Sequence, residues 1–327
     1  MKLIRYSVLA AAAVTVIYLA PVRTAAQAPV LTPATGIPWA YPLNTPVTAA
    51  APDPTILHVP NSKAGFTRAQ VTDGFNPPDW HPEGHQAMPN IVSKGRAPEM
   101  RACGYCHLPN GQGRPENSSL AGLSAAYIEQ QVNDWRDGLR TSSEPNMGPP
   151  LNMLNLSKAS NVEEVKPAAE YFSKLTYKPW VRVVEATMVP KTKAVIGMWV
   201  PDGKETEPIG MRIIETPEDL ERTEVRDDTS GFVAYVPPGS VEKGKALAAT
   251  KNTTTVQCSI CHGADLRGKG DVPALAGRSP SYIARQMNDF KTGARHGKGA
   301  AGMKGVVAKL SNEDMLYISA YTASLKP

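Results

Sequence analysis

The chain has 327 residues, enough for two ordinary domains, and its 42% hydrophobic and 20% charged residues are ordinary for a globular protein. The formal net charge is +5, yet the basic residues form no run and no aromatic residues are interleaved with them. The sequence therefore excludes nucleic acid as a partner.

The first 28 residues have the pattern of a secretory signal peptide. Lys2 and Arg5 precede an apolar run, which ends at Pro21 and is followed by small residues. A retained membrane anchor is the alternative, but the run is short for a membrane span. We therefore expect cleavage near Ala26 to Ala28, export to the periplasm, and no membrane span in the mature chain.

Residues 29–87 are rich in proline, and we expect them to form a mostly irregular arm. This arm contains the stretch NPPDWHPEGHQAMP, in which four side chains are candidate metal ligands: Asp79, His81, Glu83 and His85. Either histidine is also a candidate ligand for a nearby cofactor. The favoured expectation is an ordered polar arm on the surface, and the same holds for His58.

All four cysteines stand in two copies of the motif C-x-x-C-H, which lie 155 residues apart. Such a pair can be a redox dithiol, half of a zinc site or a haem attachment point. A redox site needs only one pair, and paired zinc motifs usually lie close together in sequence. Haem attachment accounts for every residue, because the two thiols form thioethers with the porphyrin and the next imidazole binds the iron. The sequence predicts two covalently bound haem c groups, at Cys103, Cys106 and His107, and at Cys258, Cys261 and His262.

An internal repeat surrounds the two motifs. The segment LAGLSAAYIEQQVNDWRDGLR from Leu120 aligns with LAGRSPSYIARQMNDFKTGAR from Leu275, and 11 of the 21 positions are identical. Apolar residues recur at helical spacing in both copies, so each segment predicts a helix. We expect the large apolar residues of each helix to form one wall of a pocket: Tyr127, Ile128, Val132 and Trp135, and Tyr282, Ile283, Met287 and Phe290.

The sixth ligand of each iron decides what a haem protein does. Met153 and Met303 share one register, since each lies 18 residues before a tyrosine near the end of its copy. These two residues are the predicted axial methionines. Met147, in the proline-bounded turn EPNMGPP, is the alternative for the first haem, and His296 is the alternative for the second. Methionines on helix faces are expected in the core, as for Met287 and Met315.

A second matching helix closes each copy, and the two helices end at Leu175 and Leu325. Between the copies, residues 176–240 contain alternating segments such as WVRVVEA and AVIGMWV, broken by proline and glycine turns, which predict short strands. Their content of valine, isoleucine and tryptophan is too high for a flexible tether. We therefore predict a small β-rich insert packed on one or both haem domains.

With these motifs the chain resembles the di-haem cytochrome c4 family, tandem class I cytochromes related to the c553 type. The resemblance rests on both C-x-x-C-H motifs, the two LAG…YI…Q…ND…G.R helices and the final MKGVVAKLSNEDMLYISAYTASL, and it covers residues 88–175 and 241–326. It implies a mainly α fold of two tandem class I cytochrome c domains, each holding one haem with His/Met ligation. It also implies one-electron transfer in the periplasm.

The chain departs from that family in two places. Ser118 stands where the second copy has Pro273, the proline that the family commonly places beside the proximal histidine. We still expect the Ser118 carbonyl to accept a hydrogen bond from the ring of His107, as an outer partner of the iron ligand. The β-rich insert replaces the short connection of the family.

The predicted organisation is a signal peptide at 1–28, an arm at 29–87, a first cytochrome domain at 88–175, the insert at 176–240 and a second cytochrome domain at 241–327. The expected function is relay of single electrons between periplasmic redox partners, a dehydrogenase or a terminal oxidase. One alternative is a di-haem oxidoreductase that binds substrate or peroxide at an open first haem. The other is the electron-accepting cytochrome subunit of a dehydrogenase complex. The sequence shows no other catalytic constellation, so a carrier is favoured over an enzyme.

Overall fold

A computed structural model describes residues 36–43, 53–249 and 255–327. The predicted signal peptide lies outside the described residues. All described residues belong to one unit of the chain, so the domain boundaries at residues 88, 176 and 241 stay a prediction. None of the helices in the described ranges is long and apolar enough to cross a membrane.

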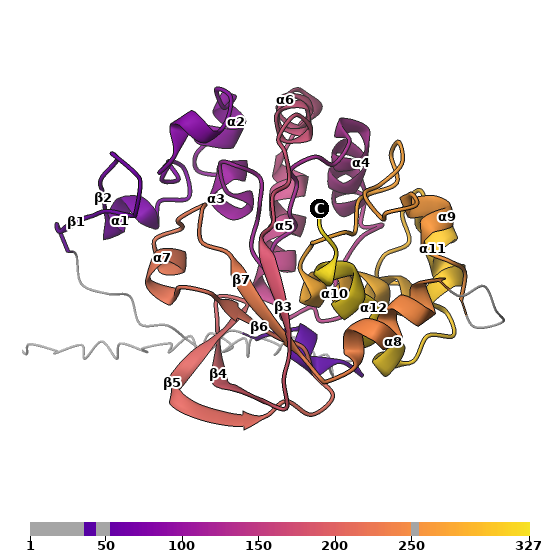
Figure 1. The fold of residues 1–327 in the computed structure, drawn as a ribbon. Coiled ribbons are helices and arrows are strands. Elements are labelled where there is room, and N and C mark those ends of the chain that lie inside the picture. Colours follow the sequence, from indigo (N-terminus) through magenta and orange to yellow (C-terminus); the bar gives the residue numbers. More distant parts are fainter. Residues whose placement is uncertain (1–35, 44–52, 250–254) are drawn as a thin grey trace, which may run out of the picture. The chain divides into compact units, whose positions relative to one another are not determined.

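The first copy of the repeat is helical, as predicted. Its helices are α2 (Asn90–Ser93), α3 (Cys103–His107), α4 (Ala125–Arg136), α5 (Gly148–Ala159) and α6 (Val162–Ser173). Side chains fix where the longer helices begin, since Ser124 accepts a hydrogen bond from the amide of Tyr127, and Asn161 and Glu164 form a capping box. Helices α5 and α6 pack against α4, and the C-x-x-C-H helix α3 packs against α2 (Figure 1).

The second copy repeats this arrangement with α8 (Ser240–Ala249), α9 (Ser259–His262), α10 (Pro280–Thr292), α11 (Ala300–Val307) and α12 (Asn312–Ser324). Helix α8 lies directly on α12 (Figure 1). Gly244 permits this approach, because a Cβ atom at that position would lie 1.9 Å from the carbonyl oxygen of Tyr317.

The insert contains the predicted strands. Strands β3 (Val181–Glu185), β7 (Phe232–Val236) and β6 (Ile214–Pro217) form one sheet in the order β3-β7-β6, with a parallel β3–β7 pair and an antiparallel β6–β7 pair. Strands β4 (Met188–Val195) and β5 (Met198–Pro208) form a hairpin, and α7 (Leu220–Glu224) precedes β7. The hairpin turn places Ile196 and Gly197 at positive φ, as a two-residue turn of type I′ requires.

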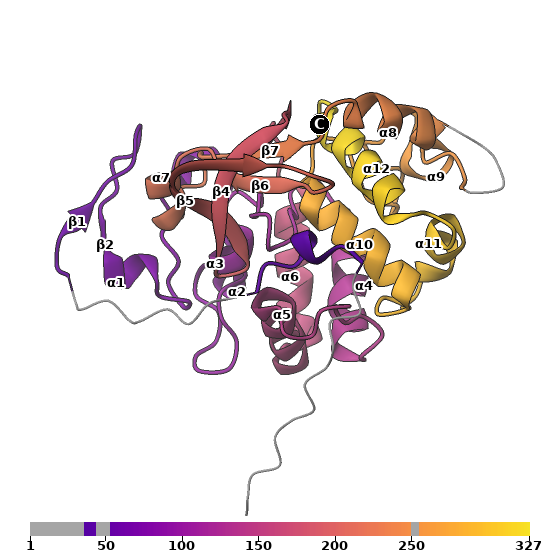
Figure 2. The same cartoon turned by 90° about the horizontal axis from the view of Figure 1, so that it is seen from below.

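The expectation of a surface arm is wrong for two parts of the arm. Residues Ile37, Trp39, Ala40 and Tyr41, in and beside the short helix η1 (Pro38–Ala40), are buried in a core cluster with residues of all three later segments: Met147, Ile213, Val236, Ala284, Leu316 and Ala320. Figure 2 shows this indigo segment beside α10. The second buried part contains Trp80 and His81, between α1 (Arg68–Val71) and η2 (Pro82–Gly84). Strands β1 (Ile56–Leu57) and β2 (Phe66–Thr67) pair within the arm.

The residue that follows each C-x-x-C-H motif adopts the same unusual backbone conformation. Gly263 has φ 85° and ψ 156°, and its counterpart Leu108 has φ 63° and ψ 152°. This region is nearly exclusive to glycine, so Leu108 is strained. Leu108 is nevertheless buried in a cluster with Trp180, Met198 and Phe232 of the insert. The side chain of Leu108, the residue with the strained backbone, therefore joins the first motif to the insert.

We expect Leu108→Gly and Gly263→Leu each to destabilise the protein. Leu108→Gly relieves about 1–3 kcal/mol of strain but removes a buried side chain that contributes about 2–5 kcal/mol. The free energy of unfolding should therefore fall by about 1–2 kcal/mol. Gly263→Leu should cost about 2 kcal/mol or more, because strain is added and the new Cβ would lie 2.8 Å from the carbonyl oxygen of Gly268. Denaturant unfolding measures both values, and a stabilised Leu108→Gly variant would contradict this role of Leu108.

Candidate haem-binding sites

A cavity lies beside the first C-x-x-C-H motif. Its empty volume is about 1780 Å³, including the space at its open mouth. Cys103, Cys106 and His107 line it from α3, and Met153 lines it from α5. The predicted wall of α4 is confirmed, since four of its side chains line the same cavity: Tyr127, Ile128, Val132 and Trp135. Two thiols, an imidazole and a thioether therefore face one largely apolar space, which fits a covalently attached haem.

His107 is held in the orientation that an iron ligand needs. Its ring Nδ1 lies 2.7 Å from the carbonyl oxygen of Ser118, which confirms the predicted contact although proline is missing there. This hydrogen bond places the ring proton on Nδ1 and leaves Nε2 as the metal-binding atom. Burial lowers the pKa of His107, so the imidazole is held in the neutral form that ligates metals.

The two candidate axial methionines of the first haem lie in different environments. Met153 is half-buried in the cavity wall, whereas Met147 is fully buried in the core cluster that contains Trp39 and Tyr41. Met147 is also the N-cap residue directly before α5, so its position is set by the backbone of the helix start. Of these two methionines, Met153 is therefore the one that lines the cavity beside His107.

The cavity also contains a buried positive charge. Arg140 lines the cavity wall, and none of the ion pairs within the described part of the chain includes it. Its guanidinium donates hydrogen bonds to the side chains of Gln131, Tyr282 and Gln286, and the nearby Asp289 carboxylate also interacts with it. The carboxylate groups of a haem would add an ionised partner in the same cavity, so Arg140 is compatible with this cofactor.

The second motif has the same hydrogen bond between its histidine and a backbone carbonyl. His262 is buried, and its Nδ1 lies 2.7 Å from the carbonyl oxygen of Pro273. Burial lowers the pKa of His262 as well. Met303 is half-buried on α11 and packs against the core of this copy, whereas the alternative ligand His296 is exposed. The prediction that Met287 and Met315 are core residues is confirmed.

The two copies of the repeat meet at equivalent residues. The amide of Thr141 donates to the carbonyl of Ala294 at 2.7 Å, and the amide of His296 donates to the carbonyl of Leu139 at 2.8 Å. Thr141 and His296 are partners in the repeat, as are Leu139 and Ala294, so the two bonds are related by an approximate two-fold axis. The insert does not separate the haem domains, which contact each other directly.

Side-chain hydrogen bonds between the copies follow the same two-fold symmetry. They join residues that are identical in the two copies of the repeat. Arg140 donates hydrogen bonds to Tyr282 and Gln286 of the other copy, and Arg295 donates to Tyr127 and Gln131 in return. Each arginine also bonds the glutamine of its own copy. The repeat predicted a pocket wall for each helix, and this interface was not predicted. Polar identities within an amphipathic repeat were the signal that could have revealed it.

Comparison with known proteins gives the same assignment. Residues 241–326 match the model of the Cytochrome c family. Cytochrome c4 of Stutzerimonas stutzeri is 33% identical over 237 residues, which cover 69% of this chain and 86% of the relative. A thiosulfate dehydrogenase electron acceptor of Thiomonas intermedia is 25% identical over 230 residues, covering 69% of this chain and 80% of the relative.

Among solved structures, reduced recombinant cytochrome c4 from Pseudomonas stutzeri superposes with a TM-score of 0.45 and 22% identity, over 68% of this chain and 93% of that one. The family assignment rests on the 33% identity to cytochrome c4 and on the two cysteine motifs. The chain belongs to the cytochrome c4 family and is an electron-transfer cytochrome with two covalently bound haem c groups.

Proposed function

We propose that the protein is a periplasmic carrier of single electrons in which a histidine and a methionine close each iron. The observation that carries this proposal is that Cys103, Cys106, His107 and Met153 line one cavity. Haem c supplies a one-electron couple when bound, and a methionine ligand raises its potential. Met303 is the proposed counterpart of Met153 in the second site, with Cys258, Cys261 and His262.

The residues of the chain hold these ligands in place and limit access to the first site. Ser118 orients His107 through its carbonyl, and α5 carries Met153 to the cavity wall. Ile196 at the tip of the β4–β5 hairpin and Arg226 also line the cavity, so the insert contributes to its enclosure. Two proposed axial ligands, His107 and Met153, line a cavity that the insert partly encloses. This arrangement supports a carrier over an enzyme with an open iron.

The contact between the two copies supports exchange of electrons within the molecule. Tyr282, Arg285 and Gln286 of α10 line the cavity of the first copy, so the second domain forms part of the first site. The similarity to a thiosulfate dehydrogenase electron acceptor supports a periplasmic dehydrogenase as the electron donor. The pattern of the first 28 residues supports export to the periplasm.

Carbon monoxide binding to the reduced protein tests this proposal. We expect no change in the visible spectrum, because both irons already have six ligands, and we expect reductive titration to consume two electrons per chain. Met153→Ala is the positive control, since it should open one iron and bind one carbon monoxide per chain. Stoichiometric binding to the wild-type protein would contradict the carrier and favour the di-haem oxidoreductase with an open first haem.

A further inference from the structure

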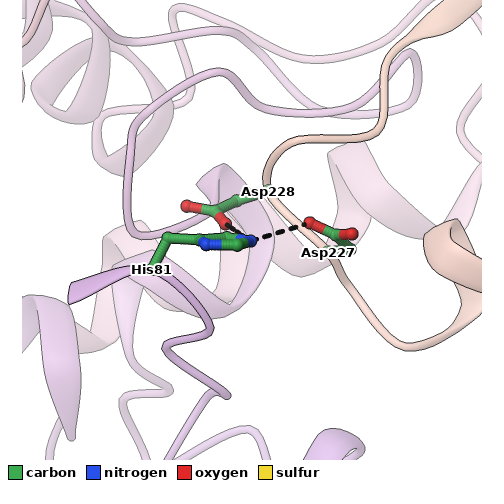
Figure 3. Close-up of side chains that lie close together, drawn as sticks. All are labelled: His81, Asp227 and Asp228. Carbon is green, nitrogen blue, oxygen red and sulfur yellow. Dashed lines mark ion pairs between the residues drawn. The ribbon is translucent and has the colours of Figure 1, made fainter. Parts of the chain in front are cut away.

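A cluster of three buried side chains lies outside both haem sites. His81 comes from the arm, while Asp227 and Asp228 come from the loop between α7 and β7 (Figure 3). Their candidate ligand atoms all lie within 4.8 Å of one another. The predicted metal ligands beside His81 were Asp79, Glu83 and His85, whereas in the structure His81 also lies beside two aspartates of the insert.

The distances suit a small metal ion. The Nε2 atom of His81 lies 3.4 Å from Oδ1 of Asp227 and 4.0 Å from Oδ1 of Asp228. Ligands about 2.1 Å from a tetrahedral zinc ion are separated by about 3.4 Å. The first distance meets this value, and the second exceeds it by about 0.6 Å, which a shift of the Asp228 side chain would have to close.

Asp228 supplies independent support for a ligand. The residue is 3% exposed, and its Oδ1 atom, which faces His81, has no hydrogen-bond partner. A buried carboxylate oxygen without a donor needs either a proton or a cation.

The surrounding residues hold the cluster as outer partners of a metal site do. The other ring nitrogen of His81 lies 3.6 Å from the carboxylate of the exposed Glu83, which is beyond hydrogen-bond distance. Arg222 binds Oδ2 of Asp227 at 2.7 Å, and Thr229 donates to its Oδ1 through both amide and hydroxyl. Trp80, next to His81, is fixed by a hydrogen bond to the carbonyl of Val225.

We propose that His81, Asp227 and Asp228 bind one divalent transition-metal ion, with zinc as the best match. An imidazole with two carboxylates suits such an ion, whereas calcium and magnesium prefer oxygen ligands alone. The ion would fasten the arm to the insert beside the first haem. The same loop already contacts the haem motif, since Asn110 donates to the carbonyl of Asp228 and Arg226 donates to the carbonyl of Tyr105.

Zinc titration of the metal-stripped holocytochrome tests the proposal. After dialysis against EDTA, isothermal titration with ZnCl2 should show one tight site per chain in the wild-type protein. His81→Gln and Asp228→Asn should each weaken binding by more than the roughly 10- to 100-fold that loss of an outer partner costs. Asp228→Asn keeps the shape of the side chain, and the visible haem spectrum shows whether each variant is folded.

His58→Gln is the matched control, because His58 is an exposed histidine of the same arm and lies outside the cluster. It should bind zinc as the wild-type protein does. The proposal is overturned if the wild-type protein has no tight site, if His81→Gln and Asp228→Asn keep it, or if His58→Gln loses it. Tighter binding of calcium than of zinc would also overturn it, since calcium does not select an imidazole.

Discussion

Replacing Met153 with alanine will remove one of the two methionine–ferric haem charge-transfer bands and lower the potential of one haem. The thioether of Met153 is the sulfur that α5 brings to the cavity of His107. Axial ligands set haem potentials over a range of about 0.8 V, and methionine ligation lies toward the oxidising end. Alanine is a good helix former, so α5 should persist and the variant should fold. Redox titration followed at visible wavelengths measures the change.

Met147→Leu is the matched control for this experiment. Met147 is buried in the core cluster, and leucine fills a similar volume, so both bands should remain and the unfolding free energy should change by less than about 1.5 kcal/mol. Met303→Ala should remove the other band. If Met147→Leu loses a band and Met153→Ala keeps both, the assignment of the first axial ligand is wrong.

Replacing Arg140 with methionine will uncouple the two haem domains. Arg140 is buried at their interface and donates to Gln131, Tyr282 and Gln286. Hydrogen bonds from a charged group contribute about 1.5–3 kcal/mol each and are not additive when they share acceptors, so we expect a loss of about 3 kcal/mol. Because the bonds to Tyr282 and Gln286 cross the interface, thermal unfolding of the holoprotein should divide into two transitions.

Arg136→Met is the control for Arg140→Met. Arg136 lies on the same helix, but its hydrogen bonds go to Asn133, Ser157 and Ser160 within the first copy. This variant should lower the melting temperature of the first domain while the pattern of transitions stays that of the wild-type protein. Equal splitting in both variants, or none in Arg140→Met, would contradict the role of Arg140 as the contact between domains.

Much of the haem site follows from sequence because its signals are local. The C-x-x-C-H motifs, the helical period that places Tyr127 and Trp135 on one face, and the alternation in the insert all lie within short windows. The carbonyl partner of His107 was also predictable, since a backbone group is present whichever side chain occupies position 118.

The features that could not be predicted from the sequence depend on contacts between distant segments. Trp39 and Tyr41 stand in a proline-rich stretch without periodicity, so nothing local predicts their burial beside α10. His81 meets Asp227 only through the fold of the insert. Leu108 occupies a position where backbone geometry favours glycine, and its reason is a hydrophobic cluster assembled from residues more than seventy positions later.

The intensity of the methionine–ferric haem band in the oxidised wild-type protein, quantified per haem, tests the central claim most directly. The proposal that Met153 and Met303 close both irons predicts two equivalents per chain. A single equivalent that disappears in Met303→Ala and persists in Met153→Ala would contradict it. The first iron would then be open or bound by another residue.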